Sequence, residues 1–134
     1  MDLTPEAKRA FSVQSYAPTP RIEGEVEGSE VLGKVVIEVG AKVVQSTIRG
    51  PAVIGKGAVI ENAYVGPFTA VGDYAIIRSS EVEHSIIIEG SAITDIGGRI
   101  ESSLIGRNVS IYRSVAKPKS YNLMLGDRSQ IGLI

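Results

Sequence analysis

The stretch IRGPAVIGKGAVIENAYVGPFTAVGD, residues 48–73, decides the fold of this chain. Three pairs of residues repeat in it at a spacing of 17: Ile48 and Val65, Ile54 and Val71, and Gly55 and Gly72. A fixed period of this length is typical of solenoids, in which each coil buries its apolar side chains only against the coils above and below it. The stretch therefore predicts a repeat protein built from short strands and turns.

The same columns extend along most of the chain when it is written in rows of 17 from Val31. The aliphatic columns are Val31, Ile48, Val65 and Val82; Ile37, Ile54, Val71 and Ile88; and Val43, Ile60 and Ile77. Small residues form further columns: Ala41, Ala58, Ala75 and Ala92, then Gly40 and Gly57, then Gly55 and Gly72. Each row divides into three short sides, so we predict a triangular coil whose sides are strands that pair with neighbouring coils.

The ends and one insertion depart from this pattern. The fourth row keeps its columns only if residues 94–99, TDIGGR, are an insertion, which places Ile100 in the column of Ile77. Ile105 and Ile111 then open a fifth row. We expect an extension or linker at residues 1–20, with a possible short helix capped by Thr4, and a β-helix domain at residues 21–134. In that domain Ile22 and Val26 begin an incomplete first coil, and residues 117–134 form a cap with a strand at 121–125 and a turn at 126–127.

Composition excludes several classes of function. Fourteen Lys and Arg residues stand against 15 Asp and Glu, so neither nucleic acid nor a membrane surface is an expected partner. The absence of cysteine excludes disulfides, thiolate catalysis and thiol zinc sites. No apolar run approaches the roughly 20 residues of a spanning helix, and the first ten residues are too polar for a signal peptide. We expect a cytoplasmic protein.

Two segments look superficially like phosphate-binding loops. Residues 28–34 read GSEVLGK and residues 50–56 read GPAVIGK. A P-loop needs Ser or Thr after its lysine to hold Mg²⁺, and here Val35 and Gly57 follow. Gly33 and Gly50 also share one repeat column, so we interpret both segments as turns of the solenoid.

Four segments together resemble a known domain. They are residues 48–73, SEVEHSIIIEG at residues 80–90, DIGGRIESSLIGRNV at residues 95–109 and LMLGDRSQI at residues 123–131. They resemble the C-terminal domain of the long-form glucose-1-phosphate thymidylyltransferases, which carry a left-handed β-helix after their catalytic domain. The periodicity does not give the hand of the coil, so the resemblance supplies it. The implied fold is all-β, a left-handed parallel β-helix of about five coils.

The resemblance also bears on catalysis. In that family the transfer of a thymidine nucleotide from dTTP to glucose 1-phosphate is carried out by an N-terminal α/β domain. That domain has a GxGTRL-type loop, a metal-binding Asp that holds Mg²⁺, and a lysine that contacts phosphate. No segment here matches these motifs. The resemblance therefore carries no catalytic residue, cofactor or metal ligand onto this chain.

Two groups of residues are candidates for a site. His84 is the only histidine, and it could serve as the general base of a hexapeptide-repeat acyltransferase that uses acetyl-coenzyme A; the alternative is a surface or corner residue beside Glu83. The basic residues near the C-terminus could bind a phosphate-bearing ligand or form a solvated end face: Arg107, Arg113, Lys117, Lys119 and Arg128.

Three functions follow. The leading hypothesis is a non-catalytic assembly or regulatory domain that forms a homo-oligomer, a trimer, through the flat sides of its prism, where flank residues such as Val36 and Val44 are available. An upstream nucleotidyltransferase domain is a further candidate partner. The alternatives are an acyltransferase with His84 as base and a regulatory module that binds a sugar nucleotide at the basic end.

Overall fold

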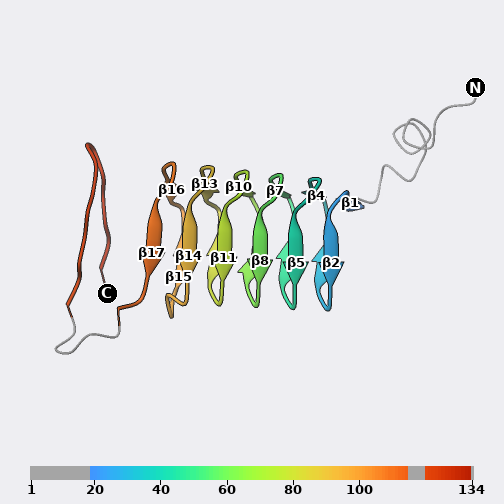
Figure 1. Cartoon of the computed structure of the whole chain (residues 1–134), viewed down its shortest axis with the longest axis horizontal. Helices are drawn as coiled ribbons and strands as arrows, with labels where there is room; N and C mark the ends of the chain where they lie inside the picture. The colour runs from blue at the N-terminus through green and yellow to red at the C-terminus, as the bar shows by residue number, and fades with distance from the viewer. Residues whose placement is uncertain (1–18, 115–119, 134) are drawn as a thin grey trace, which may run out of the picture.

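A computed structural model describes residues 19–114 and 120–133 of the chain. Every element in these residues is a short β-strand, and all the strand pairs are parallel. No helix in the described part of the chain could cross a membrane. The strands stack into three sheets that form the sides of an elongated prism (Figure 1).

The three sheets take their strands in turn. Sheet A contains β1 (Arg21–Ile22), β4 (Val35–Ile37), β7 (Ala52–Ile54), β10 (Thr69–Val71), β13 (Ile86–Ile87) and β16 (Leu104–Ile105). Sheet B contains β2 (Glu25–Glu27), β5 (Lys42–Val44), β8 (Val59–Glu61), β11 (Ile76–Arg78), β14 (Ala92–Thr94) and β17 (Ser110–Tyr112). Sheet C contains β3 (Glu30–Leu32), β6 (Thr47–Arg49), β9 (Tyr64–Val65), β12 (Glu81–Glu83) and β15 (Arg99–Glu101). The described chain thus makes five complete coils and two sides of a sixth.

The coil is left-handed. In Figure 1 the strands of sheet B face the viewer and run downwards, while successive coils advance from right to left. Because the chain returns behind these strands, it winds against the right-handed sense that parallel crossovers usually take. The predicted fold class, an all-β left-handed parallel β-helix of about five coils, is confirmed.

The aliphatic columns form the core, as predicted. Ile48 lies in register between Val31 and Val65 in sheet C, and Ile60 lies between Val43 and Ile77 in sheet B. The side chains of these central residues are fully buried. Each buried Val or Ile contributes about 1.5–3 kcal/mol, so the stacked columns hold the prism together.

The fourth row departs from its predicted register. Ile87 pairs with Val71 and is buried, whereas Ile88 is only partly buried. Ser91 takes the place predicted for Ala92, because Ala92 pairs with Ile76 instead. The cause is a shorter corner: two residues, 84–85, connect β12 to β13, while three residues, 66–68, connect β9 to β10. The prediction of Ile88 and Ala92 as column members was wrong by one residue.

The insertion also differs from the prediction. Ile93 occupies the column of Ile77, and Ile100 occupies the column of Val82. Thr94 ends β14 and Arg99 begins β15, so four residues, 95–98, replace the two that connect β11 to β12. The chain accommodates the extra length in the corner, where it need not disturb strand pairing.

Left-handed backbone shapes the corners, which we name by the sheets they join. At the A–B corner Gly40 and Gly57 have φ of 80° and 68°, as expected where only glycine avoids a Cβ penalty. The neighbouring glycine column has another cause. A Cβ on Gly72 would lie 2.6 Å from the backbone nitrogen of Glu89, so this column allows close approach of adjacent coils.

The two ends show mixed outcomes. The predicted helix at Thr4 and the basic residues Lys117 and Lys119 lie outside the described residues. The first coil is complete, because β3 follows Ile22 and Val26 as its third side. Residues 120–133, here called the C-terminal arm, make a turn at 127–128, one residue later than predicted, but no strand at 121–125, because this segment pairs with no coil. In Figure 1 the arm lies beyond the last coil.

Candidate functional site

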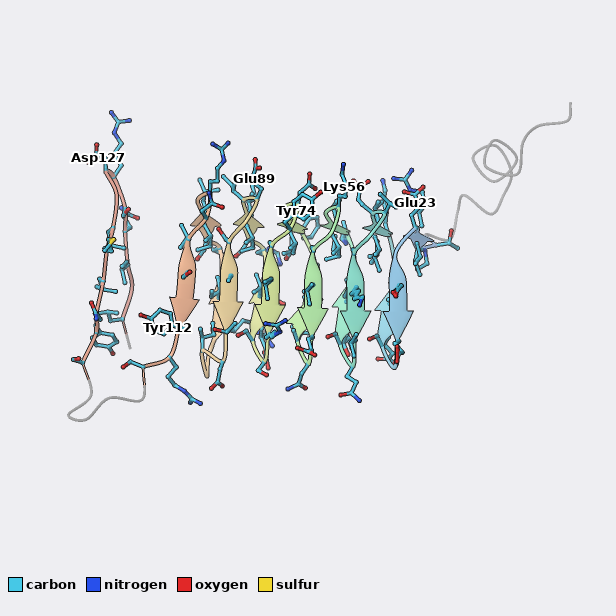
Figure 2. All side chains as sticks on the ribbon, in the orientation of Figure 1. Glu23, Lys56, Tyr74, Glu89, Tyr112 and Asp127 are labelled. Atoms are coloured by element: carbon cyan, nitrogen blue, oxygen red, sulfur yellow. The ribbon has the colours of Figure 1, made fainter. Side chains whose placement is uncertain are left out.

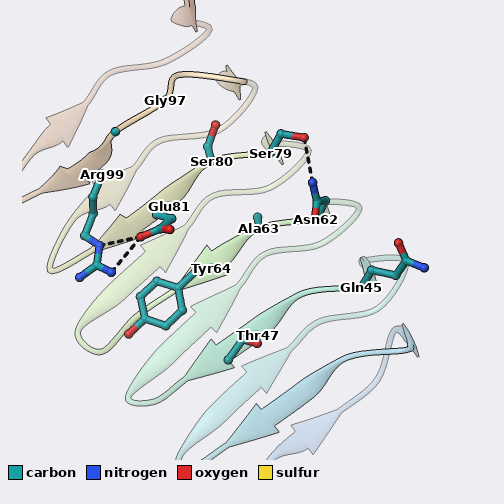
Figure 3. A pocket seen from close by; sticks show the side chains of 11 residues that line it. Gln45, Thr47, Asn62, Ala63, Tyr64, Ser79, Ser80, Glu81, Gly97 and Arg99 are labelled. Carbon is teal, nitrogen blue, oxygen red and sulfur yellow. Dashed lines mark hydrogen bonds and ion pairs between the residues drawn. The ribbon is translucent and has the colours of Figure 1, made fainter.

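The outer face of sheet C carries a polar groove of about 510 Å³ at the B–C corner. Its lining residues come from four successive coils: Gln45, Thr47, Asn62, Ala63, Tyr64, Ser79, Ser80, Glu81, Gly97, Gly98 and Arg99. Figure 3 shows these side chains on the stacked strands. The enlarged corner at residues 95–98 forms one end of the groove, and insertions in repeat proteins are often found at binding faces.

Arg99 and Tyr64 lie at the centre of the groove. The guanidinium of Arg99 donates hydrogen bonds of 2.8 and 3.0 Å to Oε1 of Glu81 and lies 3.5 Å from Glu83. It also stacks over the ring of Tyr64, 5.0 Å from the ring centre. The hydrogen bond with Glu81 raises the pKa of Arg99, so the guanidinium stays charged. Two carboxylates thus fix one cation on an aromatic ring.

A ladder of polar side chains borders the groove at the B–C corner. Gln45, Asn62 and Ser79 occupy the same place in successive coils, each with φ between 46° and 49°. The amide of Asn62 donates a hydrogen bond of 3.2 Å to the hydroxyl of Ser79. Their spacing of 17 residues is visible in the sequence. The sequence does not show that all three residues lie at one corner and line the same groove, which the structure does.

The groove offers hydrogen-bond donors and acceptors. Its one guanidinium, Arg99, is already neutralised by Glu81 and Glu83, so a phosphate would meet surplus negative charge there. In the described residues no group of three His, Cys, Asp or Glu side chains is placed to hold a metal ion. The chemistry of the groove suits a neutral polar ligand better than an anion.

The predicted basic site does not form one cluster in the described part of the chain. Arg107 lies at the A–B corner, 3.5 Å from Glu89, and Arg113 lies at the B–C corner, 3.2 Å from Asp95. The strand β17 separates these two corners. Arg128 belongs to the turn of the C-terminal arm. Arg107 and Arg113 are therefore each paired with an acidic residue of the preceding coil.

His84 is an exposed residue of the C–A corner. Its backbone is left-handed, with φ of 51°, and its backbone nitrogen donates a hydrogen bond of 3.0 Å to the carbonyl of Pro67. Its ring packs against Phe68 in the preceding coil, with ring centres 5.3 Å apart. This position agrees with the corner interpretation, and neither residue lines the polar groove.

The two glycine-lysine segments belong to the repeat. Residues 28–34 contain strand β3 and residues 50–56 contain strand β7. Strands follow both lysines within a few residues, where a P-loop would open a helix. Both segments are therefore parts of the repeat, as predicted, but each consists of a strand with its flanking corner residues rather than of a turn alone.

The outer face of sheet A differs sharply from that of sheet C. Five aliphatic residues lie in register along it, one from each coil after the first: Val36, Val53, Ala70, Ile86 and Leu104. A shallow groove runs beside this row, and its charged lining residues are Glu38, Asp73 and Glu89. Figure 2 shows Glu89, Lys56 and Tyr74 projecting from the adjoining A–B corner. Sheet A therefore presents a continuous apolar surface, here called the aliphatic row.

The geometry defines a left-handed β-helix protein with one polar and one apolar face. No family model matches the sequence. The chain is 50% identical over 113 residues to a glucose-1-phosphate thymidylyltransferase of Streptomyces antibioticus, covering 84% of this chain and 32% of that protein. It is 44% identical over 112 residues to a glucose-1-phosphate thymidylyltransferase of Streptomyces griseus, covering 83% of this chain and 31% of that protein.

A more distant relative also has glucose 1-phosphate in its name. A glucose-1-phosphate adenylyltransferase of Bacillus cytotoxicus is 38% identical over 72 residues, which cover 54% of this chain and 19% of that protein. The chain spans about a third of the length of the two thymidylyltransferases. By sequence and fold, the chain is a relative of the C-terminal β-helix domain of the long-form glucose-1-phosphate thymidylyltransferases.

Proposed function

We propose that this chain is a non-catalytic assembly domain related to the glucose-1-phosphate thymidylyltransferases, and that it associates with copies of itself through sheet A. The aliphatic row supports this proposal. Val53, Ile86 and Leu104 are large apolar side chains that remain exposed on the single chain. Contiguous apolar patches of this kind mark interaction surfaces in proteins that are otherwise stable on their own.

The contrast between faces argues that the row serves contact rather than folding. At the corresponding outward positions of sheet C stand Glu30, Thr47, Tyr64, Glu81 and Arg99, which suit contact with water. Val44, another flank residue, lies in sheet B beside Glu27 and Glu61. Sheet A is therefore the flat side whose burial would release the most apolar surface from water. A ring of three copies closes such contacts without leaving an open end.

A charge placed in the aliphatic row tests this proposal. We expect Ile86→Asp to weaken self-association at least about tenfold, since burying an unpaired carboxylate at an interface costs more than about 1.4 kcal/mol. Folding should persist because the Ile86 side chain is 52% exposed in the single chain. Sedimentation velocity across a concentration series measures the change.

Leu32→Asp is the matched control. Leu32 is 45% exposed and lies in sheet C, away from the aliphatic row. Its substitution should leave self-association as in the unmodified chain. Equal weakening by both variants would refute sheet A as the contact surface, and so would no weakening by Ile86→Asp.

The reaction that the related thymidylyltransferases are named for gives a second test. We expect this chain alone to release no diphosphate from dTTP and glucose 1-phosphate in the presence of Mg²⁺. Transfer at a triphosphate requires cations that stabilise charge on the phosphate oxygens, and Arg99, Arg107 and Arg113 are each paired with carboxylates. A coupled diphosphate-release assay is the measurement. Turnover above a control without protein would contradict the non-catalytic role, whereas turnover only with an added nucleotidyltransferase domain would support it.

A further inference from the structure

The C-terminal arm carries apolar side chains that the chain itself leaves uncovered. Every residue from 120 to 133 is exposed. Three consecutive members of the arm are large and apolar, Leu123, Met124 and Leu125, and the Met124 side chain is 99% exposed. Figure 2 places Asp127 at the tip of the arm, far from the strands of the prism. The arm is thus a second apolar surface on the chain that carries the aliphatic row.

The aliphatic row is most exposed at the end from which the arm departs. Leu104 belongs to the last coil and its side chain is 69% exposed, while Ile86 in the preceding coil is 52% exposed. The arm begins just beyond that coil (Figure 1). Both surfaces remain open in a chain whose arm is in place, so the arm does not cover the aliphatic row of its own chain.

Charge favours the same pairing. The groove beside the aliphatic row has three acidic residues and no basic one among its described lining residues, Glu38, Asp73 and Glu89, and Arg107 outside the groove lies 3.5 Å from Glu89. Within the arm Arg128 offsets Asp127, and the positive charge at this end of the chain comes from Lys117 and Lys119, which precede the arm in the sequence. An apolar arm preceded in the sequence by two lysines is complementary to an apolar row edged by carboxylates.

We infer that the C-terminal arm of one copy docks on the C-terminal end of the aliphatic row of a second copy, against Ile86 and Leu104. This inference rests on the proposed self-association, and it identifies the C-terminal arm as the segment that binds to the aliphatic row of the other copy. Each copy supplies one arm and one row, so the contact is between two different surfaces and repeats around a closed ring. The contact would cover Leu123, Met124 and Leu125 at the same time as the row.

Cross-linking between copies tests the inference directly, since the chain has no cysteine of its own. A Leu104→Cys chain and a Met124→Cys chain that carries a size tag are produced together and treated with a short bismaleimide. We expect a cross-linked species that contains one chain of each kind. A mixture of Leu32→Cys with Met124→Cys is the control and should give none above background, because Leu32 lies in sheet C.

The remaining outcomes are decisive as well. Light scattering on the same mixture first shows whether the chains associate. An oligomer without the mixed cross-link would overturn the arm contact and leave the proposed self-association standing, whereas a monomer would overturn both. A double variant, Leu104→Cys with Met124→Cys, that cross-links only within single chains would assign the arm to its own row and also overturn the inference.

Discussion

Ile60→Asp should unfold the chain or destabilise it by on the order of 3–5 kcal/mol, the effect of an uncompensated buried charge. Ile60 is fully buried at the centre of sheet B, in register with Val43 and Ile77. The new carboxylate would have only aliphatic neighbours in its column. Because whole domains of this size are stable by about 5–15 kcal/mol, the variant should show a large loss in urea denaturation followed by far-ultraviolet circular dichroism.

The neighbouring residue provides the control. Glu61 points outward and makes a 2.8 Å ion pair with Arg78, and both side chains are about half exposed. Exposed pairs contribute about 0–1 kcal/mol, so Glu61→Gln should be nearly neutral. If the two variants unfolded at the same urea concentration, the register of sheet B would be wrong.

Gly72→Ala should be the second most damaging change. A Cβ at this position would lie 2.6 Å from the backbone nitrogen of Glu89 and 2.9 Å from the carbonyl oxygen of Ile87. Neither neighbour is a flexible side chain that could turn away, so two coils would have to separate. Overpacking of this kind costs about 1–3 kcal/mol, which should appear as a lower Tm in a thermal melt.

Gly98→Ala separates this clash from the general effect of removing a glycine. Gly98 lies in the enlarged corner, and its added Cβ would have nothing within 4 Å. Replacing glycine in open space reduces the entropy of the unfolded chain and stabilises by about 0.4–1 kcal/mol. We therefore expect the Tm of Gly98→Ala to stay level or rise. A similar drop in Tm for both variants would contradict the proposed close approach of coils at Gly72.

The core columns could be predicted because burial imposes a fixed spacing on aliphatic residues. Val31, Ile48, Val65 and Val82 are 17 residues apart, and this spacing equals one coil. The prediction failed at Ile88 because residues 86–88 are all isoleucine, so composition does not show which of them points inward. The length of the corner at residues 84–85 decides it, and corner lengths depend on backbone conformation rather than on hydrophobic pattern.

The polar groove was harder to predict than the core. Thr47, Tyr64 and Glu81 follow the spacing of 17 and could have been aligned on the outer face of sheet C. Arg99 could not, because the predicted insertion at residues 94–99 removed it from any strand, whereas the structure places it at the start of β15. The ion pair with Glu81 depends on this register shift, so its two partners could not be matched from the sequence.

The apolar surfaces were only partly visible in advance. Val36 was predicted to be available for contact, and the structure places it in the aliphatic row with Val53 and Ile86. The exposure of Met124 in the arm could not be foreseen, because a cap packed on the last coil and an exposed arm would have the same sequence. Solvent exposure is a property of the packed chain, and the repeat pattern ends before the arm.

The central claim is that this β-helix assembles with itself, and the mass of the unmodified chain in solution tests it most directly. Size-exclusion chromatography with multi-angle light scattering measures that mass without reference to shape. We expect a species of three times the 14.2 kDa chain mass at micromolar concentrations. A mass of 14.2 kDa throughout that concentration range would contradict the assembly role.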